Sequence, residues 1–494
     1  MTQPTELSPI PRVPTGIAGL DAILSGGLLA GGLYIILGNP GAGKTIMANQ
    51  IAFSYVATGG KVAYLTLLAE THARMLAHLQ MMRFFDPQPV SQGLLYVSAY
   101  RTLKDGGLRG LLQFVREVVR EQRATLLVID GLITAEEFSG SEIDYKQFIH
   151  ELHTFLEAVD CTSLLLSQDS RGAETAAAHT MVDGLIELRD SAVGIRSVRE
   201  LRVRKFRGSA HLRGQHMFEI SDEGITVHPR TEVAHTRSPV PILAEPRVPF
   251  GVPGLDEMLR GGVLPRTATL ALGLPGSGKT TLAAHFLAAG VTAGEPGLLF
   301  GFGETPDDLA GLSASFALPL RGEAAAVEVL WQLPGEHNLD LLAERLLGGL
   351  ARLGARRLVI DTLSGFSAGA IYPERIGTFL AALLNELRAR DVTTLITMET
   401  PRVLDPIEDT SRLGISALVD NILFLRYAED AARLRREITV IKLRRSGFDP
   451  VARELTIGAR GLVVGAAARG EHGGEPVAGR TSPARSRRRR GHDL

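Results

Sequence analysis

Two copies of the signature G-x-x-x-x-G-K-[ST] stand in this chain of 494 residues, GNPGAGKT at 38–45 and GLPGSGKT at 273–280. Each copy follows a strand-sized apolar run and precedes a stretch with the spacing of an amphipathic helix, which is the setting that a phosphate-binding loop needs. Its glycines let the backbone wrap around phosphates, and the helix N-terminus adds partial positive charge. The chain must therefore hold two strand–loop–helix units, and we expect each to bind a nucleotide.

The residues of the two loops have separate predicted roles. Lys44 and Lys279 should reach the β- and γ-phosphates of ATP and assist catalysis. Thr45 and Thr280 should bind Mg²⁺ through their hydroxyl groups. ATP and Mg²⁺ are thus the predicted cofactors, and the predicted nucleotide-binding residues are Gly38, Asn39, Pro40, Gly41, Ala42, Gly43, Lys44, Thr45, Gly273, Leu274, Pro275, Gly276, Ser277, Gly278, Lys279, Thr280 and Thr281.

Acidic residues after apolar runs complete the predicted chemistry. Asp130 and Asp361 end such runs, where a carboxylate holds Mg²⁺ directly or through water; the alternative is an aspartate that caps the next turn. Glu70 and Glu304 lie just past the strand that follows each loop helix, where a carboxylate can accept a proton from the attacking water. The alternative for both is an acid that the dipole of the next helix favours at its N-terminus.

Further landmarks repeat in the same order, which indicates duplicated domains. The segment GIAGLDAIL at 16–24 recurs as GVPGLDEML at 251–259, and RVRKFRG around Lys205 recurs as TVIKLRR around Lys442. We therefore predict a first domain at 11–229, a proline-bearing linker at 230–249, a second domain at 250–468 and a disordered Arg-rich tail at 469–494.

Short apolar runs alternate with longer amphipathic stretches in each domain. The run LYIILG at 33–38 is strand-like, whereas 108–122 and 145–160 have helical spacing. This alternation predicts an α/β fold with a mostly parallel sheet flanked by helices. Runs that alternate more strictly predict an added antiparallel β-hairpin region late in the domain, at 198–206, 217–220 and 225–228.

Composition narrows the choice of partners and compartment. The formal net charge is −1, so the chain as a whole lacks the basic excess typical of nucleic-acid-binding proteins. Its apolar runs fall short of the ~20 residues of a membrane span, and its N-terminal segment lacks a secretory pattern. The single cysteine, Cys161, cannot form an internal disulfide. We expect a cytoplasmic protein that engages neither membranes nor nucleic acid.

Taken together, these motifs resemble the KaiC family, the ring ATPases of the cyanobacterial clock within the RecA-like superfamily. The most specific part is KFRGSAHLRGQHMFEISDEGITVHP, in which Lys205, Arg207 and His211 match the family's K-x-R-G strand and the turn after it. The second half matches at Lys442 and Arg444 but lacks the histidine.

The resemblance implies two tandem RecA-like P-loop domains in a homo-hexamer of two stacked rings, with ATP between subunits. It also implies that the five matching residues contact the nucleotide of a neighbouring subunit, and that a regulatory protein binds the ring. Lys and Arg alternate along one face of a strand, so both can point at one γ-phosphate. The alternative is a solvated basic strand face.

The chain departs from the family at the expected catalytic glutamates. The family has two adjacent glutamates after the second strand, and here Ala69 and Gly303 replace the first of each pair. If the missing glutamate is the principal base, hydrolysis or phosphotransfer is slow in both rings.

A second departure affects phosphorylation. Ser416 stands where the clock proteins carry a phosphorylated serine, but Ala417 replaces the threonine beside it. A two-site cycle is therefore not available at this pair. Ser416 remains the candidate phosphosite, with Thr410 and Ser411 nearby; the alternative is an ordinary polar residue near a strand start.

Three hypotheses follow. The leading one is an ATP-binding and ATP-hydrolysing ring protein with serine/threonine autokinase activity in signalling or circadian-type regulation. The second is a nucleotide-dependent oligomeric scaffold with little turnover, which the two missing glutamates favour. The third is a DNA-dependent RecA-like ATPase, although the sequence shows neither a separate DNA-binding domain nor a basic segment interleaved with aromatic residues.

Overall fold

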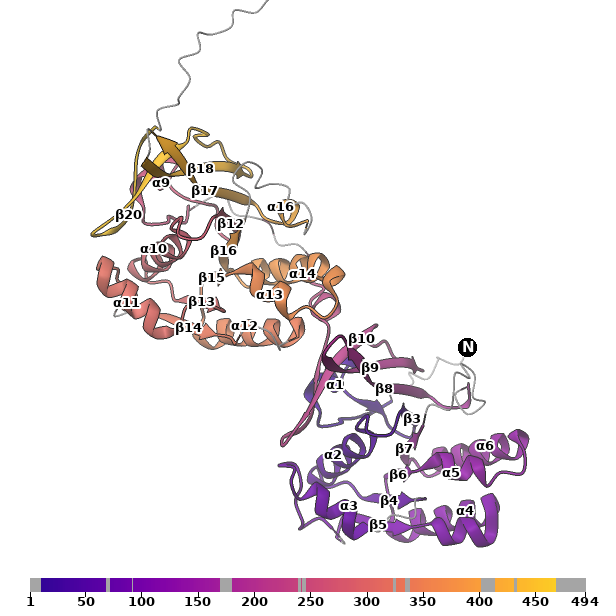
Figure 1. Cartoon of the computed structure of the whole chain (residues 1–494). Helices are drawn as coiled ribbons and strands as arrows, with labels where there is room; N and C mark the ends of the chain where they lie inside the picture. Colours follow the sequence, from indigo (N-terminus) through magenta and orange to yellow (C-terminus); the bar gives the residue numbers. More distant parts are fainter. Residues whose placement is uncertain are drawn as a thin grey trace, which may run out of the picture.

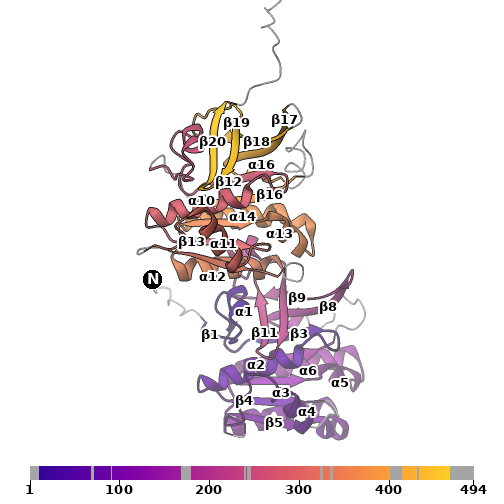
Figure 2. The same cartoon turned by 60° about the vertical axis from the view of Figure 1, so that its left-hand side comes forward.

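The computed structural model describes residues 10–67, 72–90, 92–168, 180–238, 241, 246–322, 326–333, 338–400, 414–430 and 433–467. These residues form two α/β units that follow one another along the chain (Figures 1 and 2). Ala69, Glu70, Thr410, Ser411 and the Arg-rich tail lie outside the described residues.

Nine strands build the sheet of the first unit. They are β3 (Leu33–Gly38), β4 (Val62–Thr66), β5 (Leu94–Ser98), β6 (Leu126–Asp130), β7 (Thr162–Ser167), β8 (Gly184–Val193), β9 (Arg196–Phe206), β10 (Gln215–Ser221) and β11 (Gly224–His228). Their order is β11-β10-β9-β8-β3-β7-β6-β4-β5. The strands from β8 to β5 pair in parallel, and β8 to β11 pair antiparallel. Two short strands, β1 (Arg12–Val13) and β2 (Leu28–Leu29), pair separately.

The second unit repeats this sheet. Its strands are β12 (Ala268–Gly273), β13 (Gly297–Gly301), β14 (Val327–Trp331), β15 (Arg357–Asp361), β16 (Thr393–Glu399), β17 (Asn421–Asp430), β18 (Arg433–Leu443), β19 (Arg453–Gly458) and β20 (Gly461–Ala467). The order is β14-β13-β15-β16-β12-β17-β18-β19-β20, which matches the first sheet strand for strand. The duplication seen in the sequence is therefore a duplication of topology.

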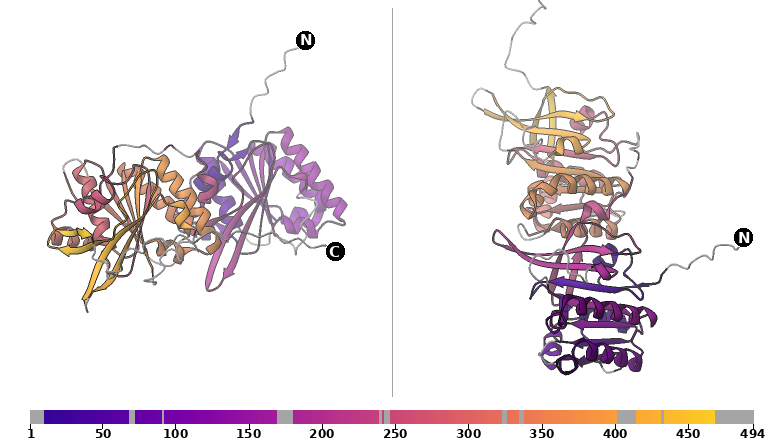
Figure 3. Two further views of the ribbon diagram at one scale, coloured as in Figure 1. Left: turned by 90° about the horizontal axis from the view of Figure 1, so that it is seen from above. Right: turned by 90° about the vertical axis from the view of Figure 1, so that its right-hand side faces the viewer.

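Helices cover both faces of each sheet (Figure 3). Those of the first unit are α1 (Ala18–Ile23), α2 (Lys44–Ala57), α3 (His72–Leu79), α4 (Tyr100–Gln122), α5 (Leu132–Glu137) and α6 (Glu142–Ala158). After them come α8 (Thr231–Ala234), α9 (Pro253–Met258), α10 (Lys279–Thr292), α11 (Pro306–Phe316), α12 (Leu339–Leu353), α13 (Leu363–Gly369), the 3₁₀ turn η1 (Pro373–Arg375), α14 (Ile376–Ala389) and α16 (Ile415–Leu418). The predicted fold of two mostly parallel sheets with helices and late antiparallel strands is confirmed.

Strand β3 shows why these sheets are buried on both faces. All six of its residues are buried. Tyr34 and Ile36 pack into the core shared with α2, whereas Leu33, Ile35 and Leu37 pack into the core shared with α4 and α6. Because successive side chains of a strand point to opposite faces, a continuous apolar run is what a central parallel strand needs.

Charged side chains join the two units. Arg375, at the end of η1, lies 2.8 Å from Glu232 Oε2 in α8 and 3.0 Å from Asp340 Oδ1 in α12. The backbone N–H of Thr231 donates to the same Asp340 oxygen at 2.9 Å. The Asp340 side chain is 0% exposed, so its charge depends on these partners. Part of the segment predicted as a linker thus packs on the second unit.

Within the described part of the chain, every helix is too short or too polar to cross a membrane.

Candidate functional site

The first phosphate loop joins β3 to α2. Gly43 precedes the helix with φ of 100°, a backbone conformation that favours glycine, and its position lets the first N–H groups of α2 face the loop. Lys44 folds over the loop and donates to the carbonyl oxygens of Gly38 at 2.6 Å and Asn39 at 3.0 Å. Burial lowers the pKa of Lys44, and the nearby Asp130 opposes that shift. The ammonium group therefore lies at the centre of the loop.

The predicted Mg²⁺ ligands of the first unit lie together. Thr45 Oγ1 donates to Asp130 Oδ2 at 2.9 Å. The Tyr64 hydroxyl donates to the same oxygen at 3.1 Å, and Asn49 Nδ2 donates to Tyr64 at 3.1 Å. The Tyr96 hydroxyl continues the network to Asn49 Oδ1 at 2.7 Å. Sequence reasoning missed Tyr64, Asn49 and Tyr96. The pairing of β4 with β6 and β5 brings the two tyrosines together near Asp130, and Asn49 reaches them from α2.

The second loop joins β12 to α10 in the same way. Gly278 has φ of 105°, and Lys279 donates to the carbonyl oxygens of Gly273 at 3.0 Å and Leu274 at 2.9 Å. Lys279 Nζ also lies 3.7 Å from Oε1 of Glu399, a residue that the sequence analysis did not single out. Burial lowers the pKa of Lys279, while the Glu399 and Asp361 carboxylates oppose that shift.

The second pair of predicted Mg²⁺ ligands also meets. Thr280 Oγ1 donates to Asp361 Oδ2 at 3.2 Å, and Thr397 donates to the other Asp361 oxygen. One hydroxyl and one carboxylate at the mouth of a phosphate loop are oxygen donors of the kind Mg²⁺ prefers, with phosphate oxygens and water completing its shell. Both units therefore fit a Mg²⁺–nucleotide complex.

A pocket of about 410 Å³ opens over the second loop. Its lining includes Lys279, Thr280, Asp361, Glu304 and Glu399. Burial raises the pKa of Glu304, and the neighbouring carboxylates of Asp361 and Asp308 add to the rise. The structure thus places Glu304 at the pocket. Its counterpart Glu70 lies outside the described residues, so the geometry of a base in the first unit stays a prediction.

The Lys and Arg residues predicted to act on a neighbour lie away from the loop, toward the amino end of the central strand. Lys205 of β9 pairs with Leu185 of β8, and Leu185 pairs with Ile35 of β3. The loop starts at Gly38, which pairs with Leu188. Lys205 is therefore level with Ile35, three residues before Gly38, which at ~3.3 Å per residue is about 10 Å along the strands.

Their side chains also turn away from the loop. Lys205 and Arg207 donate to the carbonyl oxygen of Thr180 at 2.9 Å and 3.1 Å, before β8 begins. His211 follows β9 and packs edge-on against the ring of Phe206, with centroids 6.4 Å apart. Burial, together with Arg213, lowers the pKa of His211.

The second unit has the same arrangement. Lys442 pairs with Ile422, level with Leu270 and three residues before the end of β12. Its Nζ donates to the carbonyl oxygens of Ser416 at 2.7 Å and Val419 at 2.8 Å, and Arg444 donates to Ala417 at 2.8 Å. The half-buried Ser416 in α16 is therefore directly beside the second Lys/Arg pair.

Comparison with known proteins gives consistent matches over the chain. The family described as "ATPase: KaiC" matches residues 13–232 and again 248–469. A circadian clock oscillator protein KaiC of Picosynechococcus sp. is 25% identical over 482 residues, covering 94% of this chain and 92% of that protein. The protein of the same name from Parathermosynechococcus lividus is 24% identical over 473 residues, covering 93% and 86%. The circadian clock oscillator protein KaiC 1 of Synechocystis sp. is 24% identical over 461 residues, covering 91% and 88%.

Proposed function

The chain belongs to the KaiC family of P-loop ATPases, and from that membership we propose that it binds Mg²⁺–ATP at both loops and hydrolyses it between the subunits of a ring. One observation carries this proposal. Each unit holds its phosphate loop at the carboxyl end of the central strand, and the lysine of its Lys/Arg pair is level with a residue three positions before that end. A chain built in this way supplies two different halves of a site.

Head-to-tail contact between copies would unite these halves. The surface that carries the loop differs from the surface that carries Lys205 and Arg207, so the contact is heterologous and closes into a ring when the rotation permits. An arginine supplied across such a contact accelerates phosphoryl transfer by ~10³–10⁵-fold. The hexamer, the double ring and the neighbour's contacts remain parts of the proposal.

The roles of the loop residues follow from their geometry. Lys279 would leave the loop carbonyls and neutralise the β- and γ-phosphates, and the loop N–H groups would orient them. Thr280 and Asp361 would hold Mg²⁺, which supplies charge neutralisation at the phosphates. Glu304 would accept a proton from the attacking water, and its raised pKa favours proton acceptance nearer neutral pH. Lys44, Thr45, Asp130 and Glu70 would take the same roles in the first unit.

We propose autophosphorylation at Ser416 as a second activity. Lys442 donates to the backbone carbonyl of Ser416, and Arg444 donates to that of Ala417. If these two cations reach the γ-phosphate of a neighbouring subunit, that phosphate lies near the Ser416 hydroxyl. The Ser416 oxygen would attack the γ-phosphorus, ADP would leave, and the hydroxyl proton would pass to a carboxylate of that site. The curated relatives are named circadian clock oscillators, and we extend that to a timing or signalling role here.

Incubation with Mg²⁺–ATP tests these proposals together. ATP turnover, ring mass by light scattering and phosphosite mapping by mass spectrometry would be measured on one sample. Turnover with a ring-sized mass supports the ATPase. Ring formation without turnover selects the scaffold, and a steep salt-dependent stimulation by single-stranded DNA selects the nucleic-acid motor. Turnover without phosphate on Ser416 or its neighbours eliminates the autokinase.

A further inference from the structure

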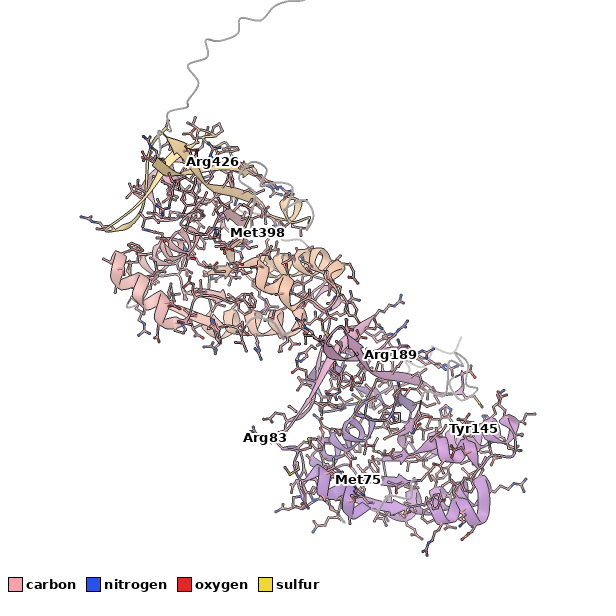
Figure 4. The ribbon with its side chains drawn as sticks, in the orientation of Figure 1. Met75, Arg83, Tyr145, Arg189, Met398 and Arg426 are labelled. Atoms are coloured by element: carbon pink, nitrogen blue, oxygen red, sulfur yellow. The ribbon has the colours of Figure 1, made fainter. Side chains whose placement is uncertain are left out.

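Glu399 distinguishes the second phosphate site from the first. It is the last residue of β16 and pairs with Gly273, where the second loop begins. In the first unit Ser167 pairs with Leu37, so the residue that follows it, Gln168, stands at the same position beside Gly38. At this matched position, the second site therefore has a carboxylate and the first site has a neutral amide. Figure 4 labels Met398, the neighbour of Glu399, inside the second unit.

The carboxylate of Glu399 is directed at the ammonium group that the nucleotide needs. Its Oε1 is 3.7 Å from Lys279 Nζ, and the Lys279 side chain is only 7% exposed. Glu399 also lines the pocket together with the loop glycines Gly276 and Gly278. Because a loop lysine of this type contacts the β- and γ-phosphates, Glu399 lies beside the space that a γ-phosphate would take.

We propose that Glu399 is a specificity-determining residue that weakens the binding of ATP relative to ADP at the second site. This inference rests on the proposed nucleotide binding. A γ-phosphate brings further negative charge next to the Glu399 carboxylate and competes with it for Lys279, whereas ADP leaves that charge out. At the matched position of the first site, the side chain of Gln168 is uncharged and adds no such repulsion, so the second unit should retain ADP more readily than the first.

Solvent screening limits how far Glu399 can change the ratio of ATP to ADP affinity. Two fixed charges 4 Å apart at an effective dielectric constant of about 20 would change affinity by about a thousandfold. The Glu399 side chain is 53% exposed, so water screens it and lets it turn away. We therefore expect about a tenfold change in the ratio of ATP to ADP affinity.

Calorimetric titration of the full chain with ADP and with a non-hydrolysable ATP analogue tests this, in Mg²⁺ and in a Lys44→Ala background that removes the first site. Glu399→Gln should tighten the ATP analogue about tenfold relative to ADP. Glu399→Asp retains the charge and should keep most of the parental ratio. The reciprocal change, Gln168→Glu in a Lys279→Ala background, should weaken the ATP analogue relative to ADP at the first site.

Each outcome decides the matter. A ratio within twofold of the parent in Glu399→Gln, or an unchanged ratio in Gln168→Glu, overturns the inference. An unchanged ratio with a tenfold fall in turnover also overturns it, since Glu399 would then act in proton transfer. If neither nucleotide binds the parent at the second site, the proposed function itself fails there, which is a different result.

Discussion

The hydroxyl of Tyr64 donates a hydrogen bond to Asp130 Oδ2 at 3.1 Å, and both side chains are buried. In the second domain Leu299 occupies the matching position of β13, two residues before the one that pairs with Asp361. There Thr397, from β16, donates to the aspartate instead. The two domains thus hold equivalent carboxylates by hydroxyl groups from different strands, so each can be perturbed alone.

Replacing Tyr64 with Phe should lower the stability of the chain by about 1–3 kcal/mol. The ring keeps its place, but Asp130 loses one donor and the buried Asn49 amide loses one of its two acceptors, keeping the carbonyl oxygen of Thr45. Urea unfolding measures the change. Tyr55→Phe is the matched control because its hydroxyl meets Thr125 at an exposed site, where the expected cost is within about 0.5 kcal/mol. Equal costs in the two variants would contradict the prediction.

Single loss of either loop lysine should remove one bound nucleotide per chain. Lys44→Ala and Lys279→Ala each withdraw the cation at the centre of one loop, while the other loop stays intact. Equilibrium binding of a labelled ATP analogue would count the sites. Lys61→Ala, at an exposed position before β4, serves as control and should bind as the parent does. If the variant that lacks both lysines binds as many nucleotides per chain as the parent and hydrolyses ATP at the same rate, the loop assignment is ruled out.

Mixing two inactive variants should restore turnover if sites are shared between subunits. In a Lys279→Ala background, one chain carries Lys44→Ala and the other carries Lys205→Ala with Arg207→Ala. When both enter one ring, about a quarter of the contacts join an intact loop to an intact Lys/Arg pair, if assembly is random. ATPase assays of the mixture and of each variant alone measure this. Activity no higher than the sum of the separate variants would show that the pair acts within its own chain or not at all.

Glu304→Gln should stabilise the second domain while slowing turnover. Burial and the nearby acids raise the pKa of Glu304 above its ordinary value of 4.5. Between the unfolded and folded pKa the folded state binds more protons, so this group lowers stability as pH rises through that window. The gain from Gln should be full above the raised pKa and absent well below 4.5. Thermal melting across pH measures it.

The exposed Asp307 offers a control for that change. It lies in the first turn of α11, where the helix dipole favours a negative charge. Asp307→Asn should therefore leave stability unchanged or lower it slightly near neutral pH. A gain of similar size in both variants would mean that general charge reduction, and not the pocket, explains the result.

Arg375→Ala should destabilise the junction between the domains by about 3–5 kcal/mol, because it leaves Asp340 and Glu232 buried without their shared cation. We expect the two domains to unfold at more widely separated temperatures in this variant than in the parent, which calorimetry would record. Arg352→Ala breaks an exposed pair with Glu328 and should cost far less stability, because water screens that pair. A comparable loss in the two variants would argue that Arg375 is not a special link.

The local parts of this architecture were predictable from sequence. Gly43 and Gly278 sit inside a signature with fixed spacing, and the apolar run of β3 identifies a central strand by itself. Both features are determined by residues close together in the sequence, and they were enough to predict the fold class.

Other site residues belong to no local pattern. Glu399 matters because β16 pairs with β12, and Tyr64 because β4 pairs with β6. Arg375 meets Glu232 from 143 residues away. Such contacts arise from strand register and domain packing, which a single sequence encodes only through the finished fold.

The separation of each loop from the Lys/Arg pair of the same unit has a consequence for how the protein behaves on dilution. If the halves are joined only between copies, a lone chain can hold ATP without hydrolysing it efficiently. Specific activity would then rise with protein concentration until assembly is complete and become constant above that point. Cellular abundance, and any binder that covers the loop or the Lys/Arg pair, would govern the reaction as directly as the supply of ATP.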